Sequence, residues 1–291
     1  MTCIEVFAPA KINLALHVTG QRADGYHLLD SLVAFAPVGD VLQLRPAAGL
    51  SLTLAGPESA GLTPGPDNLA LRGAALVAAG QGAAIHLAKH LPVASGIGGG
   101  SADAAAAVRG MLALRGTEAP AGLGQDLLAL GADLPMCRMN APLRARGIGE
   151  VLEPLSLPPL PALLVNPRLP VATPAIFRAL ACRSNPPLPE ALPVFAGPEP
   201  LIDWLAGQRN DLQPAACAVE PAILAVLDAL LQLPGCRLAR MSGSGATCFG
   251  LFDTEAEAGQ AAQLLRAARS GWWIAPAVLG DQTQRATPRR Q

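Results

Sequence analysis

Aromatic side chains are scarce in this 291-residue chain: they make up 3% of it, and Tyr26 is the only tyrosine. Charged residues are also few, at 15% against about 25% in an average soluble protein. Glycine and proline together reach about one fifth, below the share of low-complexity chains. Because hydrophobic residues make up 51%, a disordered chain is excluded and aliphatic side chains must build the cores. The length suggests about two domains.

Long apolar runs and an excess of positive charge are absent as well. The best candidate for a membrane span, residues 73–88, has 16 residues and contains Gln81 and His86, whereas a membrane helix needs about 18–20 apolar residues. The net charge of −1 argues against a nucleic-acid partner. No basic stretch followed by an apolar one marks a signal peptide at the N-terminus. We therefore expect a soluble cytoplasmic protein without nucleic-acid or membrane partners.

The six cysteines are scattered and form no C-x-x-C pair. This pattern is typical of reduced intracellular thiols that serve as small buried hydrophobes. We expect neither disulfides nor a metal site built from these residues.

Hydrophobic periodicity and breaker residues predict the elements. In the first half we expect strands at 3–7, 12–19, 31–37, 41–45 and 83–89, and helices at 68–80, capped by Asp67, at 101–115, capped by Ser101, and at 124–130. Prolines at 154, 158, 159 and 161 predict the connection to a second domain. There we expect strands at 162–166, 237–241 and 247–252, helices from Thr173 and at 202–207, 220–231 and 255–268, a loop at 185–200, and a frayed tail from Gln282.

A glycine-rich segment, Pro92–Asp103, is the most informative stretch. Glycine occupies four of the five positions from Gly96 to Gly100, so the backbone amides can approach a ligand closely. The helix expected next adds unpaired N–H groups, and together these form a cradle for phosphates. The segment fits neither the Walker pattern nor G-x-G-x-x-G. A tightly packed turn between a strand and a helix remains the alternative.

Three further features each have an ordinary structural explanation when taken alone. A second glycine cluster, 241–247, suits a hairpin turn, but it could also wall a phosphate site together with the first. Lys11 lies among apolar residues, where a lysine at a strand end can simply extend toward solvent. Asp133 follows an expected helix, where an aspartate can simply end the helix or form a turn.

Several segments in the same chain together resemble the GHMP kinases. They are PAKIN at 9–13, PVASGIGGGSADAA at 92–105, GADLP at 131–135 and MSGSGATCFGLF at 241–252. GQRADGYH at 20–27 and ARGIGEVLEPL at 145–155 resemble the branch that phosphorylates a cytidylylated methylerythritol in the non-mevalonate isoprenoid pathway. The segments run through nearly the whole chain.

The resemblance implies an α/β (α+β) fold of two domains. Residues 1–155 would form an ATP-binding domain like the second domain of ribosomal protein S5. Residues 156–291 would form a ferredoxin-like antiparallel sheet with helices. ATP would bind the first domain and the substrate would lie between the two. A monomer and a homodimer both remain open.

The implied reaction is ATP- and Mg²⁺-dependent phosphorylation of the C2 hydroxyl of the methylerythritol unit. Carried onto matching positions, Asp133 would accept the hydroxyl proton and Lys11 would hold that carboxylate ionised. The ATP phosphates would bind the loop Pro92, Val93, Ala94, Ser95, Gly96, Ile97, Gly98, Gly99, Gly100, Ser101 and Ala102, together with the second loop Gly243, Ser244 and Gly245. Ser101 would be the nearest hydroxyl for a phosphate or the metal.

The cytidylyl substrate would contact Asn13, Tyr26, His27, Thr173 and Phe177, with the rings stacking on the cytosine. A turn tyrosine and a core phenylalanine are the alternatives for Tyr26 and Phe177. The chain departs from the family at Ser95, Ile97 and Ala102, and the last departure removes one candidate metal ligand. Asp211 matches a family segment without a role. A kinase of another small alcohol, such as mevalonate or homoserine, and a non-catalytic nucleotide-binding module are the competing hypotheses.

Overall fold

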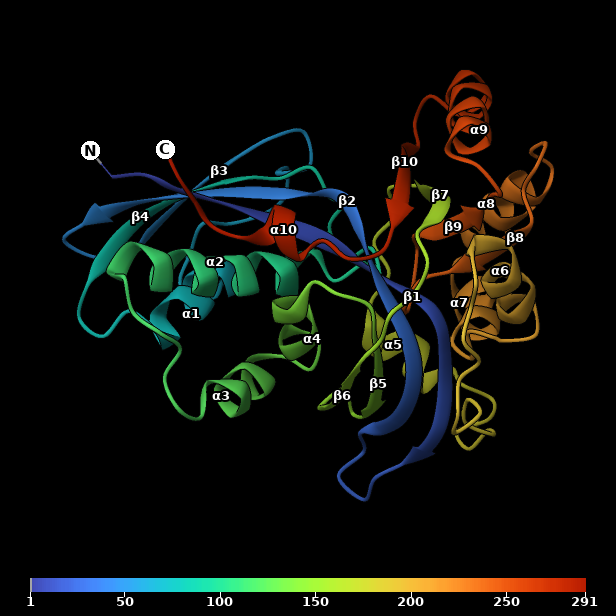
Figure 1. Cartoon of the computed structure of the whole chain (residues 1–291), viewed down its shortest axis with the longest axis horizontal. Helices are drawn as coiled ribbons and strands as arrows, with labels where there is room; N and C mark the ends of the chain where they lie inside the picture. Colours follow the sequence, from blue (N-terminus) through green and yellow to red (C-terminus); the bar gives the residue numbers. More distant parts are fainter. Residues whose placement is uncertain (1) are drawn as a thin grey trace.

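The computed structural model describes residues 2–291, and its framework is two β-sheets flanked by helices (Figure 1). The first sheet has seven strands in the order β11-β1-β2-β4-β3, with β5 paired to β2 and β6 paired to β5. Its strands are β1 Ile4–Gln21, β2 His27–Ala47, β3 Ser51–Ala55, β4 Gly82–Ala88, β5 Leu143–Gly147, β6 Val151–Pro154 and β11 Arg289–Arg290. All pairs are antiparallel except β3 with β4.

Strands β1 and β2 are each continuous where the sequence predicted two shorter strands. The prediction was wrong because bulges at Pro9/Lys11, Asn13/Ala15 and Val18/Gly20 bend β1 without ending it. Gly39 in β2 faces the Ala8 carbonyl so closely that a side chain there would clash, so the residues between the two predicted strands form a close strand contact and no break. The two strands run from the first sheet into the second half of the molecule (Figure 1).

The first half has four helices: α1 Leu69–Leu76, α2 Gly99–Arg115, α3 Leu123–Leu130 and α4 Leu134–Met139. Helix α2 packs on β1 and β2, α1 and α4 pack against α2, and α3 packs against α1 and α4. Both predicted N-caps were wrong. Asn68 caps α1, because its side chain accepts a hydrogen bond from the Ala70 amide at 3.0 Å. Helix α2 begins two residues before Ser101, because Gly98 adopts the left-handed conformation (φ 66°) at the cap.

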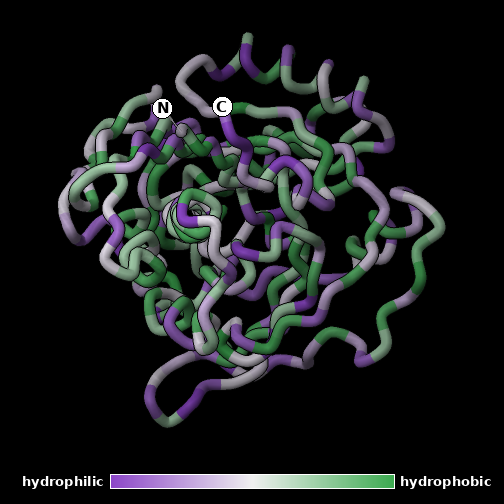
Figure 2. Tube along the Cα trace, turned by 60° about the vertical axis from the view of Figure 1, so that its left-hand side comes forward, coloured by the Kyte–Doolittle hydropathy of each residue, from purple (hydrophilic) through white to green (hydrophobic). Residues whose placement is uncertain are grey.

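The second sheet is antiparallel, with strand order β10-β7-β9-β8. Its strands are β7 Leu160–Asn166, β8 Leu238–Met241, β9 Cys248–Leu251 and β10 Trp273–Leu279, and its helices are α5 Thr173–Arg178, α6 Pro198–Ala206, α7 Gln213–Val219, α8 Ala222–Leu231 and α9 Glu255–Ala268. In chain order the fourth strand lies beside the first, as in a split β-α-β unit, which confirms the ferredoxin-like expectation. Helix α9 alternates hydrophobic and hydrophilic positions (Figure 2) and buries Ala258, Ala261 and Leu265.

The C-terminal tail is ordered, contrary to the expected fraying. It forms α10 Thr283–Ala286 and then β11, which pairs with the edge of β1. The Arg109 guanidinium donates to the carbonyls of Ala286 (3.2 Å) and Phe7 (3.0 Å), which ties the tail to the first sheet. Strands β3, β5, β6 and β10 were not predicted, because each has only four to seven residues, which is too short for its pattern to identify a strand. We propose residue 155 as the boundary between the two domains.

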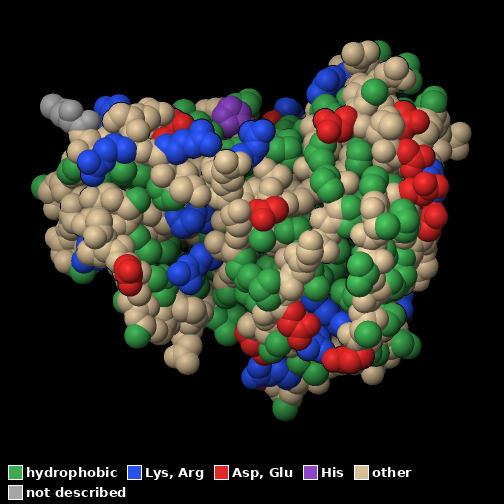
Figure 3. Space-filling view, viewed as in Figure 1, with side chains coloured by type: hydrophobic (Ala, Val, Ile, Leu, Met, Phe, Trp, Pro, Cys, Tyr) green, Lys and Arg blue, Asp and Glu red, His purple; other side chains and the backbone are tan. Residues whose placement is uncertain are grey.

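The surface carries few charges, as the composition requires. Figure 3 shows acidic and basic side chains in small groups, separated by wide hydrophobic and neutral areas. Within residues 2–291, no helix is both long enough and apolar enough to cross a membrane.

Candidate active site

A cavity of about 1230 Å³ lies where β1, β2, the two glycine loops and α5 meet. It is larger than the roughly 300–1,000 Å³ usual for one small molecule, so it has room for two ligands. The predicted site residues that line it are Lys11, Asn13, Tyr26, His27, Pro92, Val93, Ala94, Ser95, Gly96, Gly98, Gly99, Gly100, Ser101, Asp133, Thr173, Phe177, Gly243 and Ser244. The predicted Ile97, Ala102 and Gly245 are not among its lining residues.

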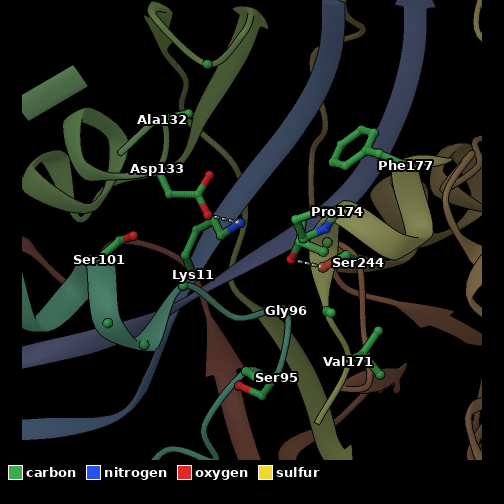
Figure 4. A pocket seen from close by; sticks show the side chains of 18 of the residues that line it. Lys11, Ser95, Gly96, Ser101, Ala132, Asp133, Val171, Pro174, Phe177 and Ser244 are labelled. Carbon is green, nitrogen blue, oxygen red and sulfur yellow. Dashed lines mark hydrogen bonds and ion pairs between the residues drawn. The ribbon is translucent and has the colours of Figure 1, made fainter. Parts of the chain in front are cut away.

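Lys11 and Asp133 form an ion pair that faces this cavity (Figure 4). The Lys11 ammonium lies 3.0 Å from Asp133 Oδ2 and donates to Asn13 Oδ1 at 2.8 Å. The Lys11 side chain is 5% exposed, whereas that of Asp133 is 40% exposed. A carboxylate held by a buried cation and open to a cavity can accept a proton from a bound hydroxyl.

The two glycine loops touch backbone to backbone. A Cβ on Gly96 would lie 2.5 Å from the Ser242 carbonyl oxygen, and a Cβ on Gly243 would lie 2.6 Å from the Gly96 carbonyl oxygen. The Thr247 amide donates to the Ser95 carbonyl (3.0 Å), and the Ser242 hydroxyl donates to the Gly96 carbonyl (3.1 Å). The second loop is therefore more than a hairpin turn, because it braces the first.

The first loop leads directly into α2, and Gly98, Gly99, Gly100 and Ser101 border the cavity at the start of that helix. The first amides of a helix have no intrahelical partner and carry a partial positive charge. This 17-residue helix thus presents an anion site to the cavity.

Two residues of the first loop, Ile97 and Ala102, have buried side chains with structural roles. Ile97 is fully buried, and its carbonyl accepts the Lys11 amide at 3.0 Å, which fixes the loop to β1. Ala102 is 1% exposed and packs in the core under α2. Its side chain does not line the cavity.

A buried cluster beneath the glycine loop was missed by the sequence analysis. The Lys89 ammonium contacts Asp40 Oδ2 and lies 2.7 Å from Asp103 Oδ2. Lys89 and Asp103 also line the cavity. Burial raises the pKa of Asp103 well above its usual range, and the charge of Asp40 raises it further while Lys89 opposes the shift. Charged residues within apolar stretches were the available signal.

The aromatic end of the cavity is formed by β2 and α5. The rings of His27 and Phe177 stack with centroids 4.7 Å apart and planes at 26°, while Tyr26 is 58% exposed. Because these two rings already touch, a base cannot lie between them in this conformation, which leaves Tyr26 and the open ring faces for stacking. His27 Nε2 is buried and has no hydrogen-bond partner among residues 2–291.

His27 provides a test of this arrangement by pH titration. Burial lowers the pKa of His27 below its ordinary value of 6.5, and the positive charge of Arg183 lowers it further. The imidazole is therefore neutral at pH 7. In an NMR titration we expect His27 to protonate below pH 6.5 in the wild type and at a higher pH in Arg183→Gln. A wild-type midpoint at or above 6.5 would contradict the described packing.

Thr173 and Asp211, which the sequence analysis singled out, and the neighbouring Asn210 hold the second loop and β1 in place. Thr173 Oγ1 lies 2.7 Å from Ser244 Oγ, which joins α5 to the second loop. Asn210 donates to the Met241 and Gly243 carbonyls at 2.8 and 2.9 Å. Asp211 accepts the Val18 amide at 2.7 Å and lies 8% exposed, so its role is to anchor β1.

Two family models and many named proteins are similar in sequence to this chain. The family described as GHMP kinases N terminal domain matches residues 68–141, and that described as GHMP kinases C terminal matches residues 196–270. Proteins named 4-diphosphocytidyl-2-C-methyl-D-erythritol kinase are 57% identical in Dinoroseobacter shibae (94% of both chains) and 54% identical in Roseobacter denitrificans (98% of this chain, 97% of that one).

Solved structures also resemble this chain over nearly its whole length. A crystal structure of 4-(cytidine 5'-diphospho)-2C-methyl-D-erythritol kinase superposes with a TM-score of 0.77 at 35% identity, over 95% of this chain and 99% of that one. A homoserine kinase from Cytophaga hutchinsonii shares the fold, with a TM-score of 0.65 at 20% identity over 99% of this chain and 97% of that one. The chain therefore belongs to the GHMP kinases and, within them, to the family of 4-diphosphocytidyl-2-C-methyl-D-erythritol kinases.

Proposed function

We propose that this chain transfers the γ-phosphoryl group of ATP to the C2 hydroxyl of 4-diphosphocytidyl-2-C-methyl-D-erythritol, in the non-mevalonate pathway to isoprenoid precursors. The observation that carries the proposal is the Lys11–Asp133 pair, 3.0 Å apart, in one cavity with the glycine loop at the start of α2. The relatives that carry this name match nearly the whole chain, which supports the same substrate.

In the proposed reaction the hydroxyl lies beside Asp133 and Lys11, and the ATP phosphates lie at the start of α2. The C2 hydroxyl is a tertiary alcohol and a weak nucleophile, so it must be aligned with the γ-phosphorus while its proton is accepted. Asp133 accepts that proton as the new oxygen–phosphorus bond forms and the bond to ADP breaks. Lys11 stabilises the carboxylate beforehand and the negative charge around the reacting oxygens afterwards. The amides at the start of α2 bind the nucleotide phosphates.

Mg²⁺ fits this site as a companion of the nucleotide. Among residues 2–291 no group of three or more His, Cys, Asp or Glu side chains gathers to hold a metal. Mg²⁺ in kinases is usually held by one or two carboxylates together with substrate phosphates and water. We propose that the Ser101 hydroxyl, at the start of α2, would be an oxygen donor of this chain for the ion. The ion would neutralise phosphate charge during transfer.

The aromatic end supports a cytidylyl substrate over smaller alcohols. Mevalonate and homoserine have no ring to stack on Tyr26 or Phe177, and the mevalonate kinase structure is only 11% identical, which shows the fold alone. Stacking contributes about 1–3 kcal/mol per base, enough to favour the cytidylyl substrate by about 5- to 150-fold. We further propose a cytoplasmic enzyme that acts on small molecules, as a monomer or a homodimer.

An ADP-release assay over a panel of acceptors tests the proposed function. We expect kcat/KM for 4-diphosphocytidyl-2-C-methyl-D-erythritol to exceed that for methylerythritol phosphate, mevalonate and homoserine by about 100-fold or more. Comparable turnover of mevalonate or homoserine would favour a different kinase. ATP binding without phosphorylation of any acceptor would favour a non-catalytic module.

A further inference from the structure

Ser31 lines the cavity, although nothing in the sequence marked it. Strand β2 directs alternate side chains to the same face, so His27, Leu29 and Ser31 all line the cavity. Ser31 is 2% exposed and lies within the strand, well away from the exposed turn before β2. A buried hydroxyl at this place must find hydrogen-bond partners, and those partners define its role.

The hydrogen bonds of Ser31 have a fixed direction. Ser31 Oγ lies 2.6 Å from the Ala15 carbonyl oxygen, which can only accept, so the serine hydroxyl must donate its single hydrogen there. The same oxygen lies 2.8 Å from the Asn13 side-chain amide, and with its hydrogen already used it can only accept. The Asn13 atom facing Ser31 is therefore the NH₂ group.

The orientation of the Asn13 amide determines which of its atoms contacts the Lys11 ammonium. With its NH₂ group on Ser31, Asn13 turns its carbonyl Oδ1 to the Lys11 ammonium, 2.8 Å away. The ammonium has donors only, so it is held between two acceptors, Asn13 Oδ1 and Asp133 Oδ2. The bulge between Asn13 and Ala15 lets one serine reach both residues, since it places an extra residue of β1 between them.

We propose that Ser31 is a positioning residue for phosphoryl transfer: it fixes the orientation of the Asn13 amide and thereby holds the Lys11 ammonium against Asp133. The inference rests on the proposed function for the roles of Lys11 and Asp133. Without the hydroxyl, the Asn13 NH₂ group loses its acceptor in a buried place. The Asn13 side chain then shifts to find another acceptor, and its Oδ1 no longer holds the Lys11 ammonium in place against Asp133.

Kinetics of Ser31 variants, alone and in a Lys11→Met background, test the contacts that lead from Ser31 to Lys11. We expect Ser31→Ala to lower kcat about 10-fold or more, with KM for ATP within about twofold of wild type. Ser31→Thr retains a hydroxyl at the same position and should restore most of kcat. In a Lys11→Met background, Ser31→Ala should cause no further loss, because the residue through which it acts has been removed.

Two results would overturn the inference: a wild-type kcat in Ser31→Ala, or an equal loss with and without Lys11. Thermal denaturation checks that each variant is folded. If the wild type does not phosphorylate the cytidylyl substrate at all, the proposed function fails but the inference can still be tested. The NMR signal of the Lys11 ammonium should then be protected from exchange in wild type and Ser31→Thr and lost in Ser31→Ala. An unchanged signal in Ser31→Ala would reject the positioning role.

Discussion

Replacing Asp133 with asparagine is expected to lower kcat by about 10²–10⁴-fold, the usual contribution of a general base. Asparagine has nearly the same shape but cannot take the hydroxyl proton, and it offers Lys11 no negative charge. Asp133 is 40% exposed and precedes α4 without being buried in the core, so the fold should tolerate the change. Steady-state kinetics with saturating ATP and cytidylyl substrate measure the effect.

Binding measurements show whether Asp133→Asn lowers kcat alone or also weakens ATP binding. Calorimetric titration of Asp133→Asn with an ATP analogue should give a Kd within about threefold of wild type, because α2 and the glycine loops are untouched. Asp126→Asn is the matched control, since Asp126 is an exposed acid on the neighbouring helix α3 and should leave kcat unchanged. A variant Asp133→Asn that retains more than about a tenth of wild-type kcat would exclude this residue as the base.

The second large effect is expected in stability. Lys89→Met should lower the free energy of unfolding by about 3–5 kcal/mol, the usual cost of removing one partner from a buried ion pair. Lys89, Asp40 and Asp103 are each at most 4% exposed, so the substitution leaves two carboxylates facing each other in the core. Urea denaturation followed by circular dichroism measures the change.

A second substitution shows whether the charge is responsible. Adding Asp103→Asn to Lys89→Met removes one of the two opposed carboxylates and should recover part of the lost stability. Met in place of Lys retains most of the aliphatic volume, so a cavity does not explain the loss. A decrease below about 1 kcal/mol in Lys89→Met would show that the cluster contributes little to folding.

The parts of the site that could be predicted from the sequence are those within short segments. The glycine loop and α2 are contiguous, so composition and helix signals locate them. Lys11 and Asp133 lie far apart in the chain, and local patterns gave each an ordinary structural explanation. The resemblance to a family, rather than any physical rule applied to one segment, placed these two together, and the structure puts them 3.0 Å apart.

The supporting residues could not be predicted because their partners are distant. Asp30 and Arg144 are separated by 114 positions and form a buried bidentate pair, with bonds of 2.8 and 2.7 Å. Ser31 directs Asn13 only because a bulge shifts the register of β1 against β2. Strand pairing and register decide these contacts, and a single sequence carries little information on either.

The position of the new phosphate in the product tests the central claim most directly. C2 of the methylerythritol unit bears a methyl group and no hydrogen, whereas C1 and C3 both bear hydrogens. After reaction with ATP, the proton-coupled ³¹P NMR spectrum should therefore show a phosphomonoester signal without splitting by a carbinol proton. A doublet or triplet at that signal would place the phosphate on C3 or C1 and contradict the assigned reaction.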